Sequence, residues 1–473
     1  MKQTKISKLL RQLVLCGLVG LLLAGAFSCK KDNTVKTYLV KVKLVYPEGF
    51  ETKAGITVKM ENKSTTTTFD EPTDAEGIAE FIVTAGKYEI SASESRVVEL
   101  VNYIFNGFLS DRMVPTVGED ETVFELSLVK SEIKQLVIKE LYNGGCQKDD
   151  GSGAFSNDQY FILYNNSYEP ATFENMCIGM CLPYNSQATN NDYVDGVLTF
   201  KTEAGEEDWI PAGQGIWSFT QPVTIAPGEQ IVVALKNAVD NTIVKNDEGD
   251  LLYSKSINFN NAAYYCTYDP ESGYNNTTSY PPPAPAISVS HYLKAHRYGL
   301  GNAWALSTSS PAFFIFTTPG NPQSFVDDVT KLNYHGAVNA SNERRKVSVS
   351  WIIDAVEVHT WENTSNKKRF TAAVDAGYVE LYNQQGFTLY RNVDKNATEA
   401  IPENEGKIVY GYSLGTAGVT VGEGDKAEVI NGTTDPSGID AEASIKNGAR
   451  IIYKNTNNTS NDFHMRSRAS LRD

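Results

Sequence analysis

Apolar and polar residues alternate along much of the chain after residue 35. Every second residue of Tyr38–Tyr46 is apolar, and Ile56–Met60 repeats the pattern. Thr73–Val83 reads as a turn around Gly77 that leads into a further alternating segment, and Gly86–Ala92 follows as its return strand. A period of two is typical of β-strands with one buried face, and glycine supplies the tight turns between them. We therefore expect residues 35–130 to form a β-sandwich.

The rest of the chain also predicts strands. Ile133–Glu140, Asp158–Asn165 and Phe313–Phe316 are short runs rich in β-branched or aromatic residues, and Pro227-Gly228 forms a turn before another such run. Long helical patterns are few, so we expect an all-β protein of tandem sandwiches. The expected units are 35–130, 131–325 and 326–473. The last of these is either a separate β domain or the other half of one large β domain.

The first 28 residues differ from everything that follows. Four basic residues precede an apolar run, Leu13–Phe27. That run has about 15 residues, fewer than the ~20 needed to span a bilayer as a helix. A basic start, a short apolar core and small residues at the end are typical of a secretory signal, here residues 1–28. No later segment is apolar enough to span a membrane.

The end of the leader, Leu23–Cys29, resembles a lipobox, although Phe27 departs from its strictest pattern. The resemblance implies that Cys29 becomes the first mature residue and carries a lipid. The alternative is an ordinary cleaved signal with an unrelated cysteine. Residues 29–34 would then be a tether, and the short charged stretch Lys30–Thr34 resembles export signals of surface lipoproteins in Gram-negative anaerobes. The implied location is the outer membrane, with the chain lipid-anchored at the cell surface.

Two segments resemble known modules. Thr73–Phe81 reads T-D-x-x-G-x-A-x-F and Gly86–Ala92 reads G-x-Y-x-I-x-A, as in carboxypeptidase regulatory-like and transthyretin-like sandwiches. The second segment resembles a lamin-tail-like immunoglobulin-like domain, although Ile162 stands where that family usually has Glu. The residues that carry this lamin-tail-like resemblance are Glu140, Tyr164–Ser167, Pro227-Gly228 and Gly320–Pro322. The whole mature chain resembles an uncharacterised family of envelope lipoproteins. These resemblances imply binding or structural roles and carry over no catalytic residue.

Charge excludes one class of partner. The formal net charge is −15, and loss of the four basic leader residues makes the mature chain about −19. A chain this acidic repels nucleic acid, so we expect no nucleic-acid partner.

Four cysteines remain besides the expected anchor: Cys146, Cys177, Cys181 and Cys266. An exported protein can form disulfides, but sequence cannot choose among the three pairings. Four reduced and buried thiols are the alternative.

No metal or catalytic motif is found. His291 and His296 lie five residues apart in a strand-like run, which would place them on opposite faces and not on one metal. The acidic loops Asp149–Gly153 and Asn246–Asp250 leave calcium open, with solvated turns as the alternative. We expect no other cofactor and no metal ligands or catalytic residues.

One loop is unusual in composition. Ala263–Pro285 carries five tyrosines among Asn, Gly and Pro. Tyrosine combines a flat apolar face with a polar tip, and long loops inside compact domains are often functional. We interpret Tyr268, Tyr274 and Tyr280 as ligand-binding anchors, with Cys266 held by a disulfide at the near end. The alternative is a loop folded back on its own sandwich.

These features favour a non-enzymatic lipoprotein that acts as a binding or accessory module of a surface uptake or adhesion system. The expected partners are the membrane, through the lipid, and either a β-barrel receptor or a glycan. A surface hydrolase acting on glycans or peptides and a structural stalk or fibre subunit remain as alternatives, because glycosidase carboxylates leave no local motif.

The lipid anchor can be tested directly. We expect Cys29→Ser to abolish fatty-acid labelling and to release the protein from membranes, because the Cys29 thiol is the acceptor. Metabolic labelling of the two forms is the measurement, and label retained in the variant would contradict the assignment.

Overall fold

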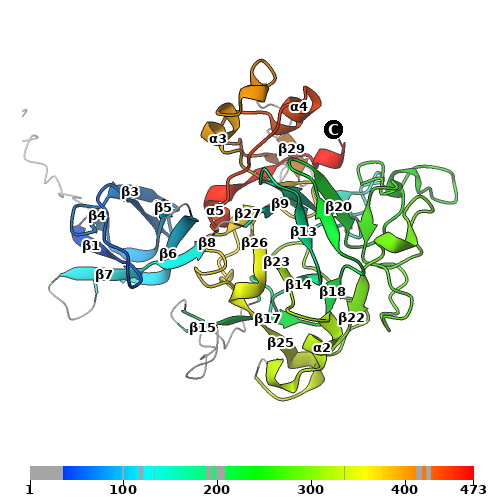
Figure 1. Cartoon of the computed structure of the whole chain (residues 1–473), viewed down its shortest axis with the longest axis horizontal. Helices are drawn as coiled ribbons and strands as arrows, with labels where there is room; N and C mark the ends of the chain where they lie inside the picture. The colour runs from blue at the N-terminus through cyan, green and yellow to red at the C-terminus, as the bar shows by residue number, and fades with distance from the viewer. Residues whose placement is uncertain are drawn as a thin grey trace, which may run out of the picture.

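The computed structural model describes residues 36–98, 101–116, 121–132, 134–187, 193–194, 197–198, 208–334, 336–411, 418–421 and 428–472. Cys29 and the leader lie outside the described residues. The predicted all-β class is confirmed, because the described residues form several β-sheets and only short helices (Figure 1). In the part described, no helix combines the length and the apolar character needed to cross a bilayer.

The N-terminal sandwich consists of a three-stranded and a five-stranded sheet, in the orders β4-β1-β7 and β3-β2-β5-β6-β8. Its core holds apolar side chains of both sheets, among them Val42, Phe81 and Ile90. Its strands are β1 (Thr37–Val45), β2 (Thr57–Asn62), β3 (Thr68–Pro72), β4 (Ile78–Thr84), β5 (Gly86–Val98), β6 (Val101–Val114), β7 (Thr122–Ser127) and β8 (Val129–Glu132).

The predicted turn at Gly77 is present, but the predicted pairing of the next two strands is wrong. Gly77 has a φ of 77°, which glycine adopts without strain. β4 pairs with β1, whereas β5 pairs with β2 and β6, so the chain crosses between the sheets at Gly86. A Cβ at Gly86 would lie 2.7 Å from Nδ2 of Asn62, which explains the glycine. Alternation alone cannot tell a hairpin from such a crossing, because both bury the same residues.

The main sandwich consists of two six-stranded sheets. The first, in spatial order, contains β21 (Tyr265–Cys266), β20 (Gln230–Ala234), β12 (Tyr160–Asn165), β9 (Leu136–Tyr142), β28 (Thr388–Arg391) and β31 (Phe463–Arg466). The second contains β22 (Lys294–His296), β18 (Ile216–Ser218), β14 (Met176–Met180), β23 (Ala312–Thr317), β26 (Ile352–Thr360) and β27 (Val379–Leu381). Side chains of both sheets share one core, among them Phe161, Leu389, Trp217 and Phe313.

The expected boundary between residues 325 and 326 is therefore corrected. β28 and β31 belong to the same sheet as β9 and β12, and β26 belongs to the same sheet as β14 and β23. Residues beyond 326 thus supply strands to both sheets, as in the alternative of one large β domain. The sequence could not settle this, because pairing between distant strands leaves no local signal.

Smaller elements surround this sandwich. The short strands are β10 (Cys146–Gln147), β11 (Ala154–Phe155), β13 (Ala171–Phe173), β15 (Tyr193–Val194), β16 (Val197–Leu198), β17 (Trp209–Gly213), β19 (Val223–Ile225), β24 (Leu332–Tyr334), β25 (Glu343–Ser348), β29 (Gly418–Val421) and β30 (Glu428–Asn431). The α-helices are α2 (Pro322–Asp327), α3 (Lys395–Glu399), α4 (Ala441–Lys446) and α5 (Thr459–Asp462). Three-residue 3-10 helices are η1 (Asn241–Ile243), η2 (Val289–His291), η3 (Val329–Lys331), η4 (Ala340–Asn342), η5 (Val349–Trp351), η6 (Pro402–Asn404) and η8 (Ser470–Arg472).

Polar contacts join the N-terminal sandwich to the main one. Nζ of Lys63 donates to Oη of Tyr378 at 2.8 Å, and that hydroxyl donates to Oε2 of Glu89 at 2.8 Å. Lys367 forms an ion pair with Asp111 at 3.1 Å. The N-terminal sandwich therefore docks beside the segment around β27 and α5, as Figure 1 shows.

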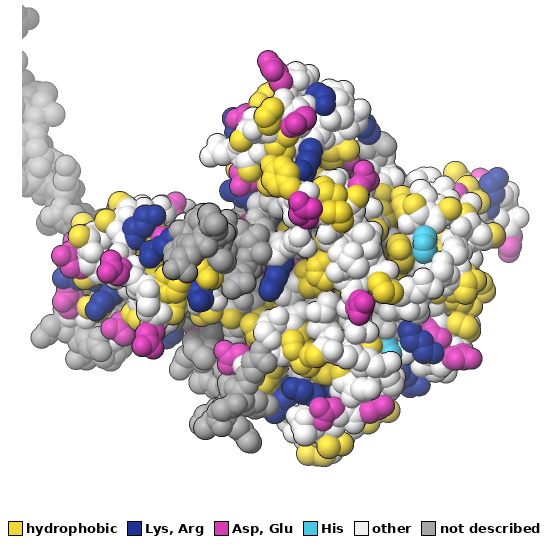
Figure 2. All heavy atoms as spheres, in the orientation of Figure 1, with side chains coloured by type: hydrophobic (Ala, Val, Ile, Leu, Met, Phe, Trp, Pro, Cys, Tyr) yellow, Lys and Arg dark blue, Asp and Glu magenta, His cyan; other side chains and the backbone are white. Residues whose placement is uncertain are grey.

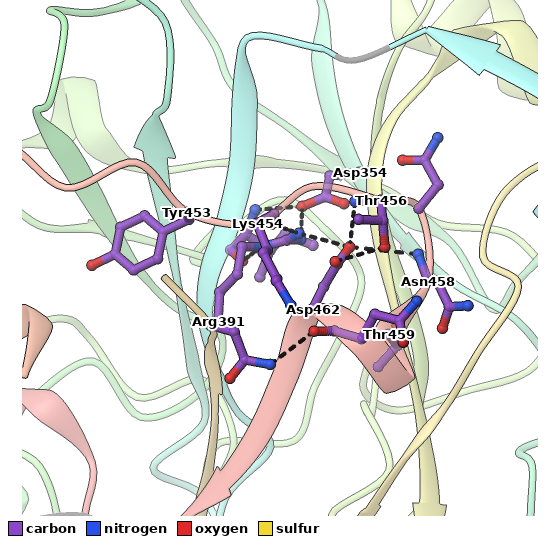
Figure 3. Close-up of polar contacts among 12 residues, drawn as sticks. Asp354, Arg391, Tyr453, Lys454, Thr456, Asn458, Thr459 and Asp462 are labelled. Atoms are coloured by element: carbon purple, nitrogen blue, oxygen red, sulfur yellow. Dashed lines mark hydrogen bonds and ion pairs between the residues drawn. The ribbon is translucent and has the colours of Figure 1, made fainter. Parts of the chain in front are cut away.

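A buried arginine links the two sheets of the main sandwich. Arg391 of β28 pairs with Asp354 of β26 and lies 3.4 Å from a carboxylate oxygen of Asp462. Nε of Arg391 also donates to the carbonyl of Ile138 at 2.7 Å, and the Ile138 amide donates to Asp354 at 2.6 Å. Figure 3 shows this cluster with Thr456, which donates twice to Asp462. All three charged side chains are almost fully buried.

We expect Asp354→Ala to lower the free energy of unfolding by about 3–5 kcal/mol, because it leaves the Arg391 charge buried without its main partner. The matched control is Lys395→Ala, which removes one partner of the exposed Lys395–Glu399 pair at 3.9 Å and should cost no more than about 1 kcal/mol. Urea denaturation of both variants is the measurement. Equal, small effects would show that the buried cluster does not hold the sheets together.

Candidate functional site

The tyrosine loop is packed onto the main sandwich. The rings of Tyr274 and Tyr280 lie 5.8 and 5.5 Å from that of Trp217. Their hydroxyls donate to the backbone carbonyls of Gln214 at 2.7 Å and Trp304 at 2.6 Å. Burial raises the pKa of both phenols. The expectation that they project as free anchors is therefore corrected in favour of the folded-back alternative.

Tyr268 is less committed than the other two. It is part-buried and meets the ring of Tyr292 edge-on, with centroids 5.3 Å apart. Its role in recognition stays a prediction. The three predicted anchors do not form one surface, because Tyr268 packs with Tyr292 while the other two pack on Trp217.

The cysteines are free thiols, and all four are buried. The disulfide that the sequence left open is not formed. Cys266 lies in β21, where its backbone pairs with Ala234 of β20, so strand pairing holds the near end of the loop. Burial raises the pKa of all four thiols, to about 12 for Cys146 and Cys266, which makes them poor nucleophiles.

The acidic loops lie close together, and the side-chain oxygens of Asp149, Asp150 and Asn246 accept hydrogen bonds from nearby residues. The Asp149 carboxylate accepts bonds from the Ser254 amide at 2.7 Å and its hydroxyl at 2.6 Å. The Asn246 side chain accepts from the Asp250 amide at 2.8 Å. Within the described ranges, no group of three or more His, Cys, Asp or Glu side chains is placed to hold a metal ion. The loops thus have the hydrogen bonds of the turn alternative.

A hollow on the described surface lies beside the tyrosine loop. It has a volume of about 90 Å³ and opens between the turn joining β18 to β19 and the turn that contains η2. We call it the aromatic pocket. Its lining consists of Phe219, Thr220, Gln221, Pro222, Val223, Tyr265, Ser290, His291, Tyr292 and Leu293.

Aromatic rings build one wall of the aromatic pocket. The rings of Tyr265 and His291 stack with centroids 4.1 Å apart and planes 19° apart, and Phe219 lies 5.4 Å from Tyr265. Nδ1 of His291 lies 3.1 Å from the Tyr264 carbonyl, which can only accept. Nδ1 is therefore the donor in this contact.

The rest of the lining combines polar and apolar side chains without a carboxylate or a basic lysine or arginine. Thr220, Gln221 and Ser290 are exposed and offer hydroxyl and amide groups. No Lys, Arg, Asp or Glu contributes to the lining. This arrangement can bind a neutral, hydrogen-bonding ligand with a flat face.

Sequence reasoning missed most of this pocket. It singled out the tyrosine loop, which contributes Tyr265, but not the turn Phe219–Val223 or Ser290. Both turns are short and irregular in composition, so no periodic pattern marks them. His291 lies in η2 and His296 in β22, so the two histidines do not share the strand expected for them.

A second arrangement contains a serine and a histidine. Ser218 Oγ lies 2.8 Å from Nε2 of His296, whose Nδ1 lies 2.8 Å from Oε1 of Gln323. Burial lowers the pKa of His296. The order matches that of a hydrolytic triad, but a neutral amide stands where a carboxylate would stabilise the imidazolium. Ser218 and His296 are only 4% and 5% exposed.

Part of the chain matches a known family. Residues 226–410 match the family model DUF4876, described as a protein of unknown function. The DUF4876 span includes Tyr265, the η2 turn and His296. The expected likeness to an uncharacterised family is confirmed to that extent. No curated protein matches the chain.

Several solved structures are similar in part. A DUF4876 family protein from Bacteroides thetaiotaomicron is 17% identical with a TM-score of 0.45, and the alignment covers 90% of this chain and 94% of that one. The minor pilin GBS52 of Streptococcus agalactiae has 14% identity, a TM-score of 0.14, and coverage of 20% and 46%. The major pilin subunit of Bacillus cereus, BcpA*(D312A), is 12% identical with a TM-score of 0.14. That alignment covers 70% of this chain and 100% of the pilin chain. At these low TM-scores, no function follows for this chain.

The packing of the loop predicts different effects of two substitutions. We expect Tyr280→Ala to lower the free energy of unfolding by about 3 kcal/mol, because it empties a packed site and removes the bond to Trp304. Tyr268→Ala should cost about 1 kcal/mol or less, as is usual for part-exposed positions. Thermal and urea unfolding are the measurements. A larger loss for Tyr268→Ala would contradict the packing described.

Proposed function

We propose that the protein is a lipid-anchored, non-catalytic binding module of the Gram-negative outer membrane, exposed at the cell surface. The observation that carries the binding role is the aromatic pocket, which combines a stacked Tyr265–His291 wall with uncharged donors and acceptors. The leader and Cys29 support the location.

The chemistry of the pocket favours a neutral sugar. Sugars present hydroxyl groups at their edges and apolar faces that stack on aromatic rings. About 90 Å³ corresponds to roughly three water molecules, which suits one edge of a sugar ring and not a whole disaccharide. A net charge of −15 also disfavours acidic ligands. The part of the ligand that enters the pocket would therefore be the neutral terminal sugar of a glycan.

The wider role that we propose is accessory. A glycan-binding lipoprotein at the surface would concentrate ligand for an uptake or adhesion system, with a β-barrel receptor as the partner. This part rests on the expected location alone. Calcium is not needed by the proposed pocket, whose lining has no carboxylate.

A surface hydrolase is the second candidate, because Ser218, His296 and Gln323 form a hydrogen-bonded series. Binding is favoured over hydrolysis for two reasons. The neutral Gln323 gives the imidazolium little stabilisation, and Ser218 is almost fully buried. A stalk role is compatible with the N-terminal sandwich as a spacer.

The test is a screen of neutral glycans against the chain from residue 30 onward. We expect a ligand whose affinity falls roughly tenfold or more in His291→Ala, because one face of its binding wall is lost. The matched control is Ser341→Ala, an exposed polar side chain in η4 outside the pocket. Calorimetry measures both.

Two outcomes would contradict the proposal. Glycan affinity that is the same in His291→Ala and wild type would move the site elsewhere. Release of free sugar or peptide by wild type, lost in Ser218→Ala while folding is retained, would establish the hydrolase.

A further inference from the structure

We infer that the outer face of the sheet β4-β1-β7 rests on the lipid surface when the chain is anchored. We call this surface the tether face. The inference rests on the proposed anchor at Cys29 and adds an orientation that the anchor alone does not give.

The tether face exposes large apolar side chains. Leu39 of β1 and Ile82 of β4 are direct cross-strand partners, and they are 47% and 71% exposed. Val123 of β7, opposite Lys41, is 45% exposed. Nothing in the described chain covers these three side chains, although the opposite face of the same strands fills the core with residues such as Val40 and Phe81. Uncovered apolar groups that lie together on a sheet mark an interaction surface.

The length of the tether limits what the face can meet. Residues 29–35 separate the expected lipid from Lys36, and seven residues span at most about 25 Å. Leu39 follows Lys36 by three residues and lies near the start of β1. A membrane is therefore always within reach of this end of the sheet, at a high effective concentration.

The tether face carries both basic and acidic side chains, paired across its strands. Lys41 forms ion pairs with Glu121 at 2.5 Å and with Glu80 at 3.9 Å. Lys43 adds exposed positive charge further along β1, opposite the exposed Glu125 of β7. Figure 2 shows basic and acidic side chains intermixed with apolar ones on the visible face of the N-terminal sandwich. Repulsion from anionic headgroups is thus weaker here than over the acidic remainder.

A second copy of the chain would be the other natural occupant. Lipid is favoured because the tether brings it to this face in every molecule, whereas a dimer depends on protein concentration. The patch is also small, with three large apolar side chains, while stable protein interfaces bury on the order of 800 Å² per partner.

The experiment uses the mature chain with Cys29 coupled to a maleimide phospholipid in vesicles of phosphatidylethanolamine and phosphatidylglycerol. The other four thiols are buried and leave Cys29 as the reactive one. All five tryptophans lie between residues 209 and 361, so Ile82→Trp adds the first to the N-terminal sandwich. We expect brominated lipids to quench the added fluorescence of Ile82→Trp. Val329→Trp, at an 80% exposed apolar position of η3, is the matched control and should not be quenched.

The outcomes separate this inference from the anchor itself. Adding Leu39→Glu to Ile82→Trp should abolish quenching while the protein still sediments with the vesicles. Attached protein without quenching of Ile82→Trp would overturn the inference, as would a vesicle-free dimer that Leu39→Glu dissociates. Chemical coupling bypasses lipidation in cells, so a wild-type protein that takes up no fatty-acid label would contradict only the proposed anchor.

Discussion

The main sandwich depends on one buried charge that lies between its sheets. Arg391 comes from the first sheet, Asp354 from the second, and Ile138 offers backbone groups to both. Two β-bulges allow Arg391, Asp354 and the backbone of Ile138 to come together. The pairing of β9 with β12 skips Lys139, and the pairing of β26 with β23 skips Ile353. A bulge frees ladder groups and redirects side chains, so the bulged strands can exchange hydrogen bonds across the core. Because an unpaired buried charge is costly, the sheets have one favourable relative position.

The same constraint explains why the aromatic pocket has a fixed shape. Its walls come from turns at the ends of β18, β19 and β22. Of these strands, β18 and β22 belong to the second sheet, and β19 pairs with β13. Among the loop tyrosines, Tyr265 lines the pocket, whereas Tyr274 and Tyr280 pack on Trp217 and support the scaffold. A binding site on short turns over such a scaffold needs little rearrangement, which lowers the entropic cost of binding.

The sequence predicted the strands well and their partners poorly. Alternation located β1, β2 and β4, and the Pro-Gly turn located β20, because these signals are local. The crossing at Gly86 and the sharing of both sheets by residues beyond 326 were not predictable, since they depend on distant pairing. At the site, tyrosine composition directed attention to Ala263–Pro285 but could not show which face of each ring was already covered. Thr220, Gln221 and Ser290 carry no pattern at all, and only the fold brings them together.

The position of β31 in the chain has a consequence for how the protein is made. Phe463–Arg466 forms the edge of the first sheet beside β28, and Ser470 donates its amide to the buried Glu140 at 3.0 Å. Glu140 lies more than 300 residues earlier, so this sheet stays incomplete until the segment that contains β31 and Ser470 has been synthesised. Proteases that degrade incomplete chains would then distinguish a chain that contains β31 from one that lacks it. A chain that ended before Phe463 would expose the β28 edge and leave the buried Glu140 carboxylate with the Tyr160 hydroxyl but without the Ser470 donors.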